Sequence, residues 1–271
     1  MFQLRRLTTM NMTQPDYEYL SVQLEESIAL VCLNRPAKRN AISDALVAEL
    51  RHAFETMPET VRAVVLHAKG EHFCAGLDLA EMRERPTVEA MHHSRMWHAA
   101  FEQIQFGRAP VIAVLKGATI GGGLELASAC HVRVAEESAF YALPEGSRGL
   151  FVGGGASVRV SRLIGVARMG DMMLTGRVYD AQEGYDTGIA QYLVKSGEGL
   201  AKARELAARI AQNSPTTNYA VTHVLPRIAD QSIQDGLLTE SLMAAIALSD
   251  PQTQERLAAF LEHKVGRVVP K

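Results

Sequence analysis

The sequence predicts a mixed α/β fold for roughly the first two thirds of the chain, followed by an all-helical region. Two observations favour this division. Short apolar runs alternate with amphipathic stretches up to Gly153, and only helical periodicity is expected beyond it. The chain has 271 residues, 47% of them hydrophobic and 21% charged, which is typical of a globular protein with a large core.

The strands of the first part are expected from two patterns. Leu20, Val22 and Leu24 alternate with polar residues, which indicates a half-buried strand over residues 19–24. Continuous apolar runs indicate strands that are buried on both faces. These more buried strands are predicted over residues 28–33, 63–67, 110–115 and 132–135.

The helices follow from caps and periodicity. Ser43 is a suitable N-cap for a helix that runs to about Glu55. Further helices are predicted over residues 88–104 and from Leu124, after a glycine-rich loop. Beyond Gly153, helices are expected over residues 156–164, 166–174, 181–187, 200–212, 217–227, 233–247 and 252–263.

Charge and cysteine usage exclude several classes of protein. The formal net charge is −2 and no basic stripe is interleaved with aromatics, so we expect no nucleic-acid partner. No apolar run approaches the roughly 20 residues that span a bilayer, so no membrane association is expected. The three cysteines form no CxxC pair, which favours a reducing, cytoplasmic setting. His92, His93 and His98 lack further ligands at a useful spacing, and we predict no metal site.

The first residues form a distinct segment. Residues 1–14 contain Arg5 and Arg6 and no acidic residue, as targeting peptides do. They lack an apolar core and a small-residue cleavage site, however. We therefore predict a disordered extension over residues 1–15.

Two glycine runs, at residues 121–123 and 153–155, require an explanation. Neither has the third glycine of the dinucleotide-binding pattern, and no Walker A, HExxH or G-x-S-x-G motif occurs. The first run lies between an apolar strand and a helix, so it exposes backbone N–H groups and a partial positive charge. Such a turn binds a phosphate or an oxyanion. An oxyanion fits better, because the lysine and hydroxyl partners of a phosphate loop are absent.

Two glutamates accompany these turns. Glu125 lies in the first turn of the helix after the glycines, and Glu145 follows Pro144. A second small-residue turn, Ala75-Gly76, also ends a strand. Each turn alone is explained by a tight turn with a capping glutamate. Together, however, two backbone-donor turns and two carboxylates supply the parts of an oxyanion hole with an acid–base pair.

An ordered set of short motifs runs from about residue 17 to residue 264. No single motif is specific, but their order is. They occupy residues 34–36, 40–41, 73–78, 110–113, 117, 121–123, 144–145, 159, 163–165 and 174–177. This set closely resembles the crotonase superfamily and, within it, the enoyl-CoA hydratases.

The resemblance implies a crotonase-like spiral of ββα units with two sheets, followed by an all-helical C-terminal trimerisation region. We therefore expect a catalytic core over residues 16–200 and a helical region over residues 201–271. It also implies a homo-trimer, or a hexamer that is a dimer of trimers. His263 and Lys264 occupy the stretch where relatives carry a basic pair that approaches the cofactor's phosphates from a neighbouring subunit.

The resemblance further assigns roles to residues of the site. The N–H groups of Leu77 and Gly122 would form the oxyanion hole for the thioester carbonyl. Glu125 would position and activate a water, and Glu145 would exchange the proton at the α-carbon. The substrate, coenzyme A included, would contact Lys38, Arg39, Ala41, Ala75, Gly76, Asp78, Leu79, Gly121, Pro144 and Gly153.

The implied activity is hydration of a 2-enoyl-CoA, with coenzyme A as part of the substrate and no permanently bound cofactor. An isomerase or C–C lyase of the same superfamily is the nearest alternative, and a non-catalytic acyl-CoA-binding protein is a second. Two carboxylates favour a hydratase, because the isomerases need one base. Leu143 and residues 149–152 depart from the usual hydratase pattern, so Phe151 and Tyr141 are candidates for reshaping the acyl pocket.

Overall fold

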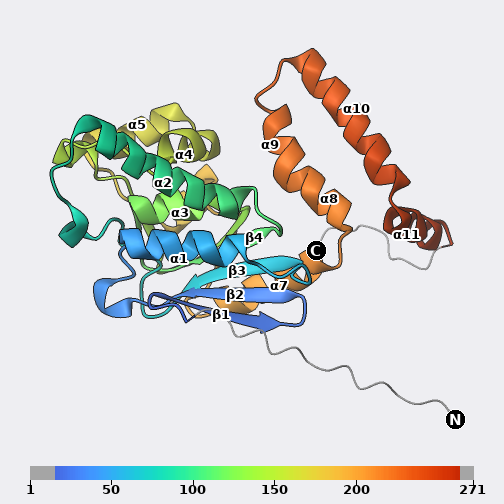
Figure 1. Ribbon diagram of the computed structural model, residues 1–271, viewed down its shortest axis with the longest axis horizontal. Coiled ribbons are helices and arrows are strands. Elements are labelled where there is room, and N and C mark those ends of the chain that lie inside the picture. The colour runs from blue at the N-terminus through green and yellow to red at the C-terminus, as the bar shows by residue number, and fades with distance from the viewer. Residues whose placement is uncertain (1–15, 263–271) are drawn as a thin grey trace, which may run out of the picture.

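The computed structural model describes residues 16–262 and contains two sheets (Figure 1). The main sheet consists, in spatial order, of β1 (Leu20–Glu25), β2 (Ile28–Leu33), β3 (Ala63–Ala68), β4 (Val111–Leu115), β6 (Val132–Glu136) and β9 (Tyr192–Val194). β1 is antiparallel to β2, and the other neighbours are parallel. The small sheet consists, in spatial order, of β5 (Ala118–Ile120), β7 (Phe140–Ala142) and β8 (Tyr179–Asp180).

Helices cover the main sheet on both faces. One face packs against a core that includes α1 (Asp44–Glu55), α2 (Thr87–Gln105) and α3 (Gly122–Ala129). The other face packs against α7 (Gly199–Ala211). Within β3, Val64 and Leu66 face the first layer, whereas Ala63 and Val65 face α7. This double burial explains why the central strands read as continuous apolar runs.

Most predicted elements are confirmed, but the region after Gly153 is not all helical. β8 and β9 lie in it, and β9 pairs with β6 at the edge of the main sheet. β5 and β7 were also missed. These four strands have only two or three residues each, too few to show a two-residue period. α3 begins at Gly122 rather than Leu124, because its first turn is made by glycines.

The helix predicted over residues 217–227 is interrupted. The structure has α8 (Pro215–Tyr219), a π-helical turn η4 (Ala220–Val224) and α9 (Leu225–Ile228). Pro226 carries no N–H and cannot complete the helical bond to the carbonyl four residues earlier. The widened turn accommodates this missing donor.

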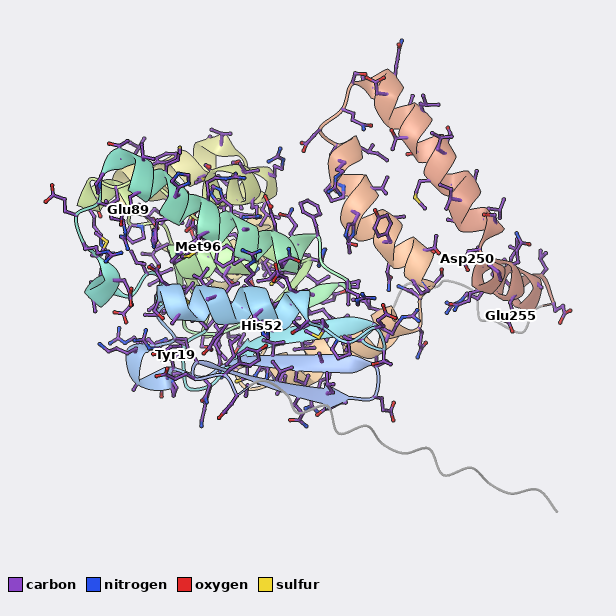
Figure 2. The ribbon with its side chains drawn as sticks, in the orientation of Figure 1. Tyr19, His52, Glu89, Met96, Asp250 and Glu255 are labelled. Carbon is purple, nitrogen blue, oxygen red and sulfur yellow. The ribbon has the colours of Figure 1, made fainter. Side chains whose placement is uncertain are left out.

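Helices α8 to α11 project from the body of the molecule (Figure 1). The longest of them is α10 (Ile233–Ser249), followed by α11 (Pro251–Leu261). Gly236 is the only buried residue in the described helix α10. The apolar side chains of this helix extend into solvent (Figure 2). Between residues 16 and 262, no helix is both long and apolar enough to cross a bilayer. The predictions on residues 1–15, His263 and Lys264 lie outside the described residues.

Asn40 fixes the segment that leads into α1. It is fully buried in a left-handed conformation, with φ +54°. Its Oδ1 accepts from the N–H of Arg35, and its Nδ2 donates to the carbonyls of Lys69 and His72 at 3.0 and 2.8 Å. The first hydrogen bond closes the loop before α1, and the other two hold this loop against the loop after β3.

We therefore expect Asn40→Ala to lower the free energy of unfolding by about 3 kcal/mol, because it leaves buried donors and acceptors unpaired. Urea unfolding measures this loss. The control Lys38→Ala changes an exposed residue of the same loop and should stay within about 0.5 kcal/mol of the wild type. Equal losses in both variants would contradict this role for Asn40.

Candidate active site

Two turns lie side by side at the end of β5. The N–H of Cys74 donates to the carbonyl of Ala118 at 2.9 Å, and the N–H of Ile120 donates to the carbonyl of Cys74 at 3.1 Å. Gly76 has φ +96°, and a methyl there would lie 2.9 Å from the carbonyl oxygen of Ile120. The same methyl would lie 3.7 Å from the nitrogen of Gly122. Glycine is therefore required for the close approach of the two turns.

Each turn presents one free N–H group. Ile42 pairs with the residues on both sides of Leu77, through the carbonyl of Gly76 and the N–H of Asp78. The N–H of Leu77 therefore points away from this partner. Gly122 is the first residue of α3, where no intrahelical acceptor exists. Neither N–H donates to another group within residues 16–262, so both can donate to a ligand oxygen.

Glu125 lies behind these turns, with 4% of its surface exposed. Its Oε1 accepts from the N–H of Gly154 at 2.7 Å and from the N–H of Ala156 at 3.1 Å. The N–H of Gly155 also faces this carboxylate. These three groups form a backbone nest, residues 154–156, at the start of α4 (Ala156–Ile164). The second glycine run therefore binds a carboxylate of the chain itself.

Opposing effects act on Glu125. Burial raises its pKa, because the ionised form is poorly solvated there. The N–H groups of Ala156 and Gly154 lower the pKa of Glu125, and so, to a smaller extent, does the charge of Arg159. The net effect raises the pKa of Glu125, while the donors of the nest favour its ionised form and limit that rise.

Glu145 lies against the first turn without such an anchor. A methyl on Gly121 would lie 2.7 Å from its Oε1. Its Oε2 is buried, and nothing in the described part of the chain donates to it. Burial raises the pKa of Glu145 and the charge of Glu125 raises it further, against opposing contributions from its own N–H and from Arg148. The pKa values of both carboxyls are thus raised, but only that of Glu125 is opposed by a set of backbone donors from another segment.

Trp97 of α2 forms an apolar wall of this site, a role that the sequence did not reveal. It is 3% exposed. A methyl on Gly122 would lie 2.9 Å from its Cζ3, and a methyl on Gly154 would lie 3.1 Å from its Cε3. Phe101 supports the indole edge-on, with ring centroids 5.7 Å apart. The indole therefore lies against both Gly122 and the nest that holds Glu125.

The residues predicted to contact substrate have different surroundings. Exposed ones are Lys38, Arg39, Leu79 and Gly153; half-buried ones are Ala75 and Pro144; buried ones are Ala41, Gly76, Asp78 and Gly121. Asp78 has partners within the chain. It forms an ion pair with Arg35 at 2.7 Å and accepts from the N–H of Ala80 at 3.1 Å. The Ala80 hydrogen bond and the Arg35 charge lower the pKa of Asp78.

The residues named as departures from the hydratase pattern, or as candidates for reshaping the acyl pocket, differ in how deeply they are buried. Tyr141 is fully buried, and its ring lies so close to Gly184 of α6 (Ala181–Thr187) that no side chain fits there. A role for Tyr141 in shaping the acyl pocket stays a prediction. Leu143 is fully buried, whereas Phe151 is 71% exposed and is free to contact a ligand.

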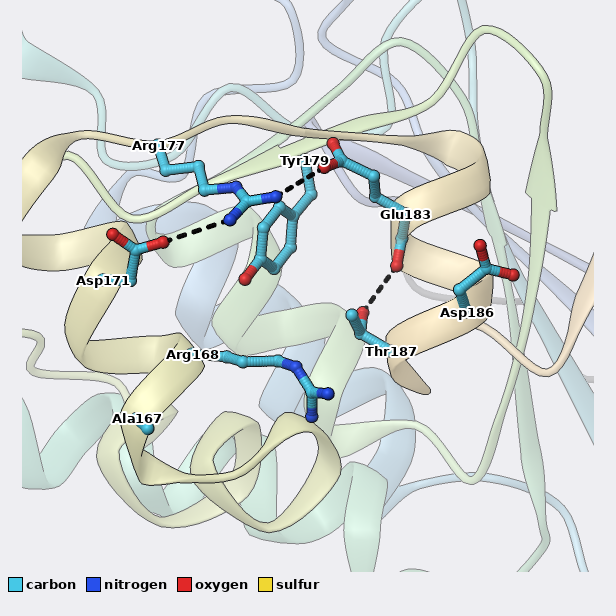
Figure 3. A pocket seen from close by; sticks show the side chains of 8 residues that line it. All are labelled: Ala167, Arg168, Asp171, Arg177, Tyr179, Glu183, Asp186 and Thr187. Atoms are coloured by element: carbon cyan, nitrogen blue, oxygen red, sulfur yellow. Dashed lines mark hydrogen bonds and ion pairs between the residues drawn. The ribbon is translucent and has the colours of Figure 1, made fainter.

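A separate cavity of about 450 Å³ lies between α5 (Val166–Thr175), β8 and α6 (Figure 3). Three of its charged side chains pair with one another: Arg177 bridges Asp171 at 3.4 Å and Glu183 at 2.7 Å. Neither Glu125 nor Glu145 lines it. No group of side chains suited to hold a metal ion occurs among residues 16–262.

Comparisons with known proteins agree with this geometry. A sequence profile described as enoyl-CoA hydratase/isomerase matches residues 23–266. The chain is 30% identical over 249 residues to 2,3-dehydroadipyl-CoA hydratase of Escherichia coli K12, covering 90% of this chain and 96% of the relative. A solved structure from Rhodopseudomonas palustris is 57% identical, with a TM-score of 0.89, covering 92% and 96% of the two chains. An enoyl-CoA hydratase structure from Bacillus anthracis is 31% identical, with a TM-score of 0.84, covering 91% and 97%. These neighbours confirm the expected crotonase-like fold.

The raised pKa of Glu145 predicts a pH-dependent stability. A carboxyl whose folded pKa exceeds its unfolded pKa stabilises the fold fully below the unfolded pKa. This contribution is lost as pH rises through the folded pKa. We therefore expect the Tm of Glu145→Gln to exceed that of the wild type increasingly as pH rises from 4 to 9. Calorimetry measures the difference, with Glu137→Gln, at an exposed residue, as the control that should run parallel to the wild type. Parallel curves for Glu145→Gln would contradict the prediction.

Proposed function

The chain belongs to the enoyl-CoA hydratase/isomerase family, and we propose that it adds water across the double bond of a 2-enoyl-CoA thioester. The choice of hydration rather than isomerisation rests on one observation. Two carboxyls with different surroundings, Glu125 and Glu145, lie at the same glycine turn and act on each other electrostatically. Hydration requires a base for the water and an acid for the α-carbon, whereas moving a double bond requires one proton carrier.

The free N–H groups of Leu77 and Gly122 would hold the thioester carbonyl oxygen. Negative charge develops on this oxygen when the double bond is attacked. Donors that are already oriented stabilise that charge without reorganisation, and removal of one such donor in other enzymes costs about 3–4 kcal/mol. The Trp97 wall lies against Gly122 and strengthens the effect by excluding water.

The two glutamates would divide the proton transfers. Glu125 takes a proton from water as the water oxygen bonds to the β-carbon of the substrate. The electron pair of the double bond moves toward the α-carbon and the carbonyl oxygen. Glu145 then delivers its proton to the α-carbon. One carboxyl gains a proton and the other loses one, so exchange with solvent restores the starting state.

Coenzyme A would follow the exposed Lys38 and Arg39 and reach the site past Leu79. Lys38 and Arg39 offer positive charge to its phosphates, and residues 75–76 line the approach. Asp78, which pairs with Arg35, would shape this path through the loop that it holds rather than through its charge. We propose coenzyme A only as part of the substrate, without a permanently bound cofactor.

The C-terminal helices would assemble the protein into a homo-trimer or a dimer of trimers. α10 exposes Ile233 at 83%, Leu238 at 62% and Leu242 at 59% of their surface. Contiguous apolar surface of this kind is characteristic of a subunit interface. The division into residues 16–200 and 201–271 remains part of this proposal. A reducing, cytoplasmic setting is supported by three free thiols, at Cys32, Cys74 and Cys130.

The first test of the activity is hydration of crotonyl-CoA, followed by loss of the enoyl absorbance. We expect the wild type to form 3-hydroxybutyryl-CoA. Glu125→Gln and Glu145→Gln should each fold and lose about 10²- to 10⁴-fold in kcat, because each removes one proton carrier. Glu137→Gln, at an exposed residue, serves as the matched control and should retain activity.

Near wild-type rates in either glutamine variant would disprove the proposed pair. Products analysed in D₂O separate the alternatives. A shifted double bond would indicate an isomerase, and binding without any turnover would indicate an acyl-CoA-binding protein.

The assembly is tested by a charge within the exposed face of α10. Leu242→Glu should lower the mass measured by size-exclusion chromatography with light scattering, because a buried unpaired carboxylate destabilises an apolar interface. Leu24→Glu, which changes a 40% exposed leucine on β1, should leave the mass unchanged. A wild type that elutes as a monomer would contradict the proposed trimer.

A further inference from the structure

Two side chains support the backbone nest from behind. Ser94 of α2 donates through Oγ to the carbonyl of Gly153 at 2.6 Å. The same peptide group carries the N–H of Gly154, which donates to Glu125 at 2.7 Å. Hydroxyl, peptide group and carboxylate therefore form one continuous hydrogen-bonded chain.

A second chain runs beside the first. Arg159 of α4 donates through Nη1 to the carbonyl of Gly154 at 3.1 Å. That peptide group carries the N–H of Gly155, which also faces Glu125. Gln105 of α2 orients the guanidinium by accepting from its Nε at 2.7 Å. α2 and α4 thus each contribute a donor to the carbonyl of a peptide group whose N–H belongs to the nest.

Donation to the carbonyl of an amide makes its N–H a stronger donor, because hydrogen bonds in a chain polarise one another. A charged donor such as Arg159 has the larger effect. Orientation matters as well, since residues 153–155 are glycines with little intrinsic preference for one conformation. Without support at their carbonyls, these peptide groups would be free to rotate away from Glu125.

We propose that Ser94 and Arg159 are positioning residues, which hold the nest toward Glu125 and polarise its peptide groups, and which thereby favour the ionised form of Glu125. Neither side chain touches the proposed reacting atoms. Their effect on catalysis rests on the proposed hydration, whereas their effect on the proton affinity of Glu125 does not.

The groups around Glu125 decide whether its pKa rises or falls when Ser94 or Arg159 is replaced. The titratable and charged groups around this carboxylate and its supports are Arg159 on α4, His98 and Glu102 on α2, Cys130 after α3, and Glu145 and Arg148 after β7. Removing a support weakens donors that favour the ionised form of Glu125. Its pKa should therefore rise, and the acid limb of the kcat/KM profile should move to higher pH.

The experiment compares Ser94→Ala with Ser94→Thr, which keeps the hydroxyl, and Arg159→Met with Arg162→Met. Arg162 lies on the same helix and pairs at the surface with Asp230. The readouts are the pH profile of crotonyl-CoA hydration and the infrared titration of the Glu125 carboxyl, assigned by its loss in Glu125→Gln. We expect Ser94→Ala to move the acid limb and the infrared midpoint upward by about 0.5 unit or more, and Arg159→Met to move them further. A shift of 0.5 unit corresponds to about threefold lower kcat/KM at pH values on the acid side of the limb. Ser94→Thr and Arg162→Met should match the wild type.

A uniform loss of rate with an unchanged acid limb would mean that Ser94 only maintains the structure, and would overturn the proposal. An unchanged infrared midpoint in both Ser94→Ala and Arg159→Met would overturn it whether or not the protein hydrates crotonyl-CoA. A shifted midpoint in a protein without hydratase activity would support the positioning role and disprove the proposed function instead.

Discussion

The contact between the Glu125 carboxylate and the N–H groups of residues 154–156 fixes the arrangement of the whole site. Glu125 lies in a part of the core where an unpaired carboxylate would be strongly destabilising. The start of α4 supplies the missing donors, so α3, the glycine loop and α4 depend on one another. A methyl on Gly154 would lie 2.6 Å from Oε2 of Glu125. The composition of the loop thus follows from the carboxylate that it holds.

The short strand β5 brings the remaining parts together. It lies between the segment at Cys74, with which Thr119 forms a bridge, and β7, where Ala142 is the register partner of Ile120. The turn that follows β5 therefore meets the turn with Leu77 on one side and the residues just after β7 on the other. Glu145 is three positions beyond Ala142, which places it over that same turn.

This arrangement also explains how far the sequence alone could predict the structure. The central strands were predicted because burial on both faces requires continuous apolar runs. β5, β7, β8 and β9 were not, because two- or three-residue strands are defined by their neighbours rather than by a local pattern. Glu125 and Glu145 were predicted as an acid–base pair from local motifs and from the family resemblance. Trp97, Ser94 and the nest were missed, because each acts across a long stretch of chain and α2 carries no motif of its own.

The asymmetry between the two carboxyls comes mainly from the backbone. Hydration requires one ionised and one protonated carboxyl at the same moment, and two equivalent carboxyls would leave the proton without a preferred position. Each carboxyl also has one arginine that lowers its pKa, Arg159 for Glu125 and Arg148 for Glu145. The N–H groups of the nest serve Glu125 alone and cannot be removed by ordinary side-chain substitutions. The difference between the two carboxyls is therefore set by the path of the backbone rather than by side chains that a substitution can replace.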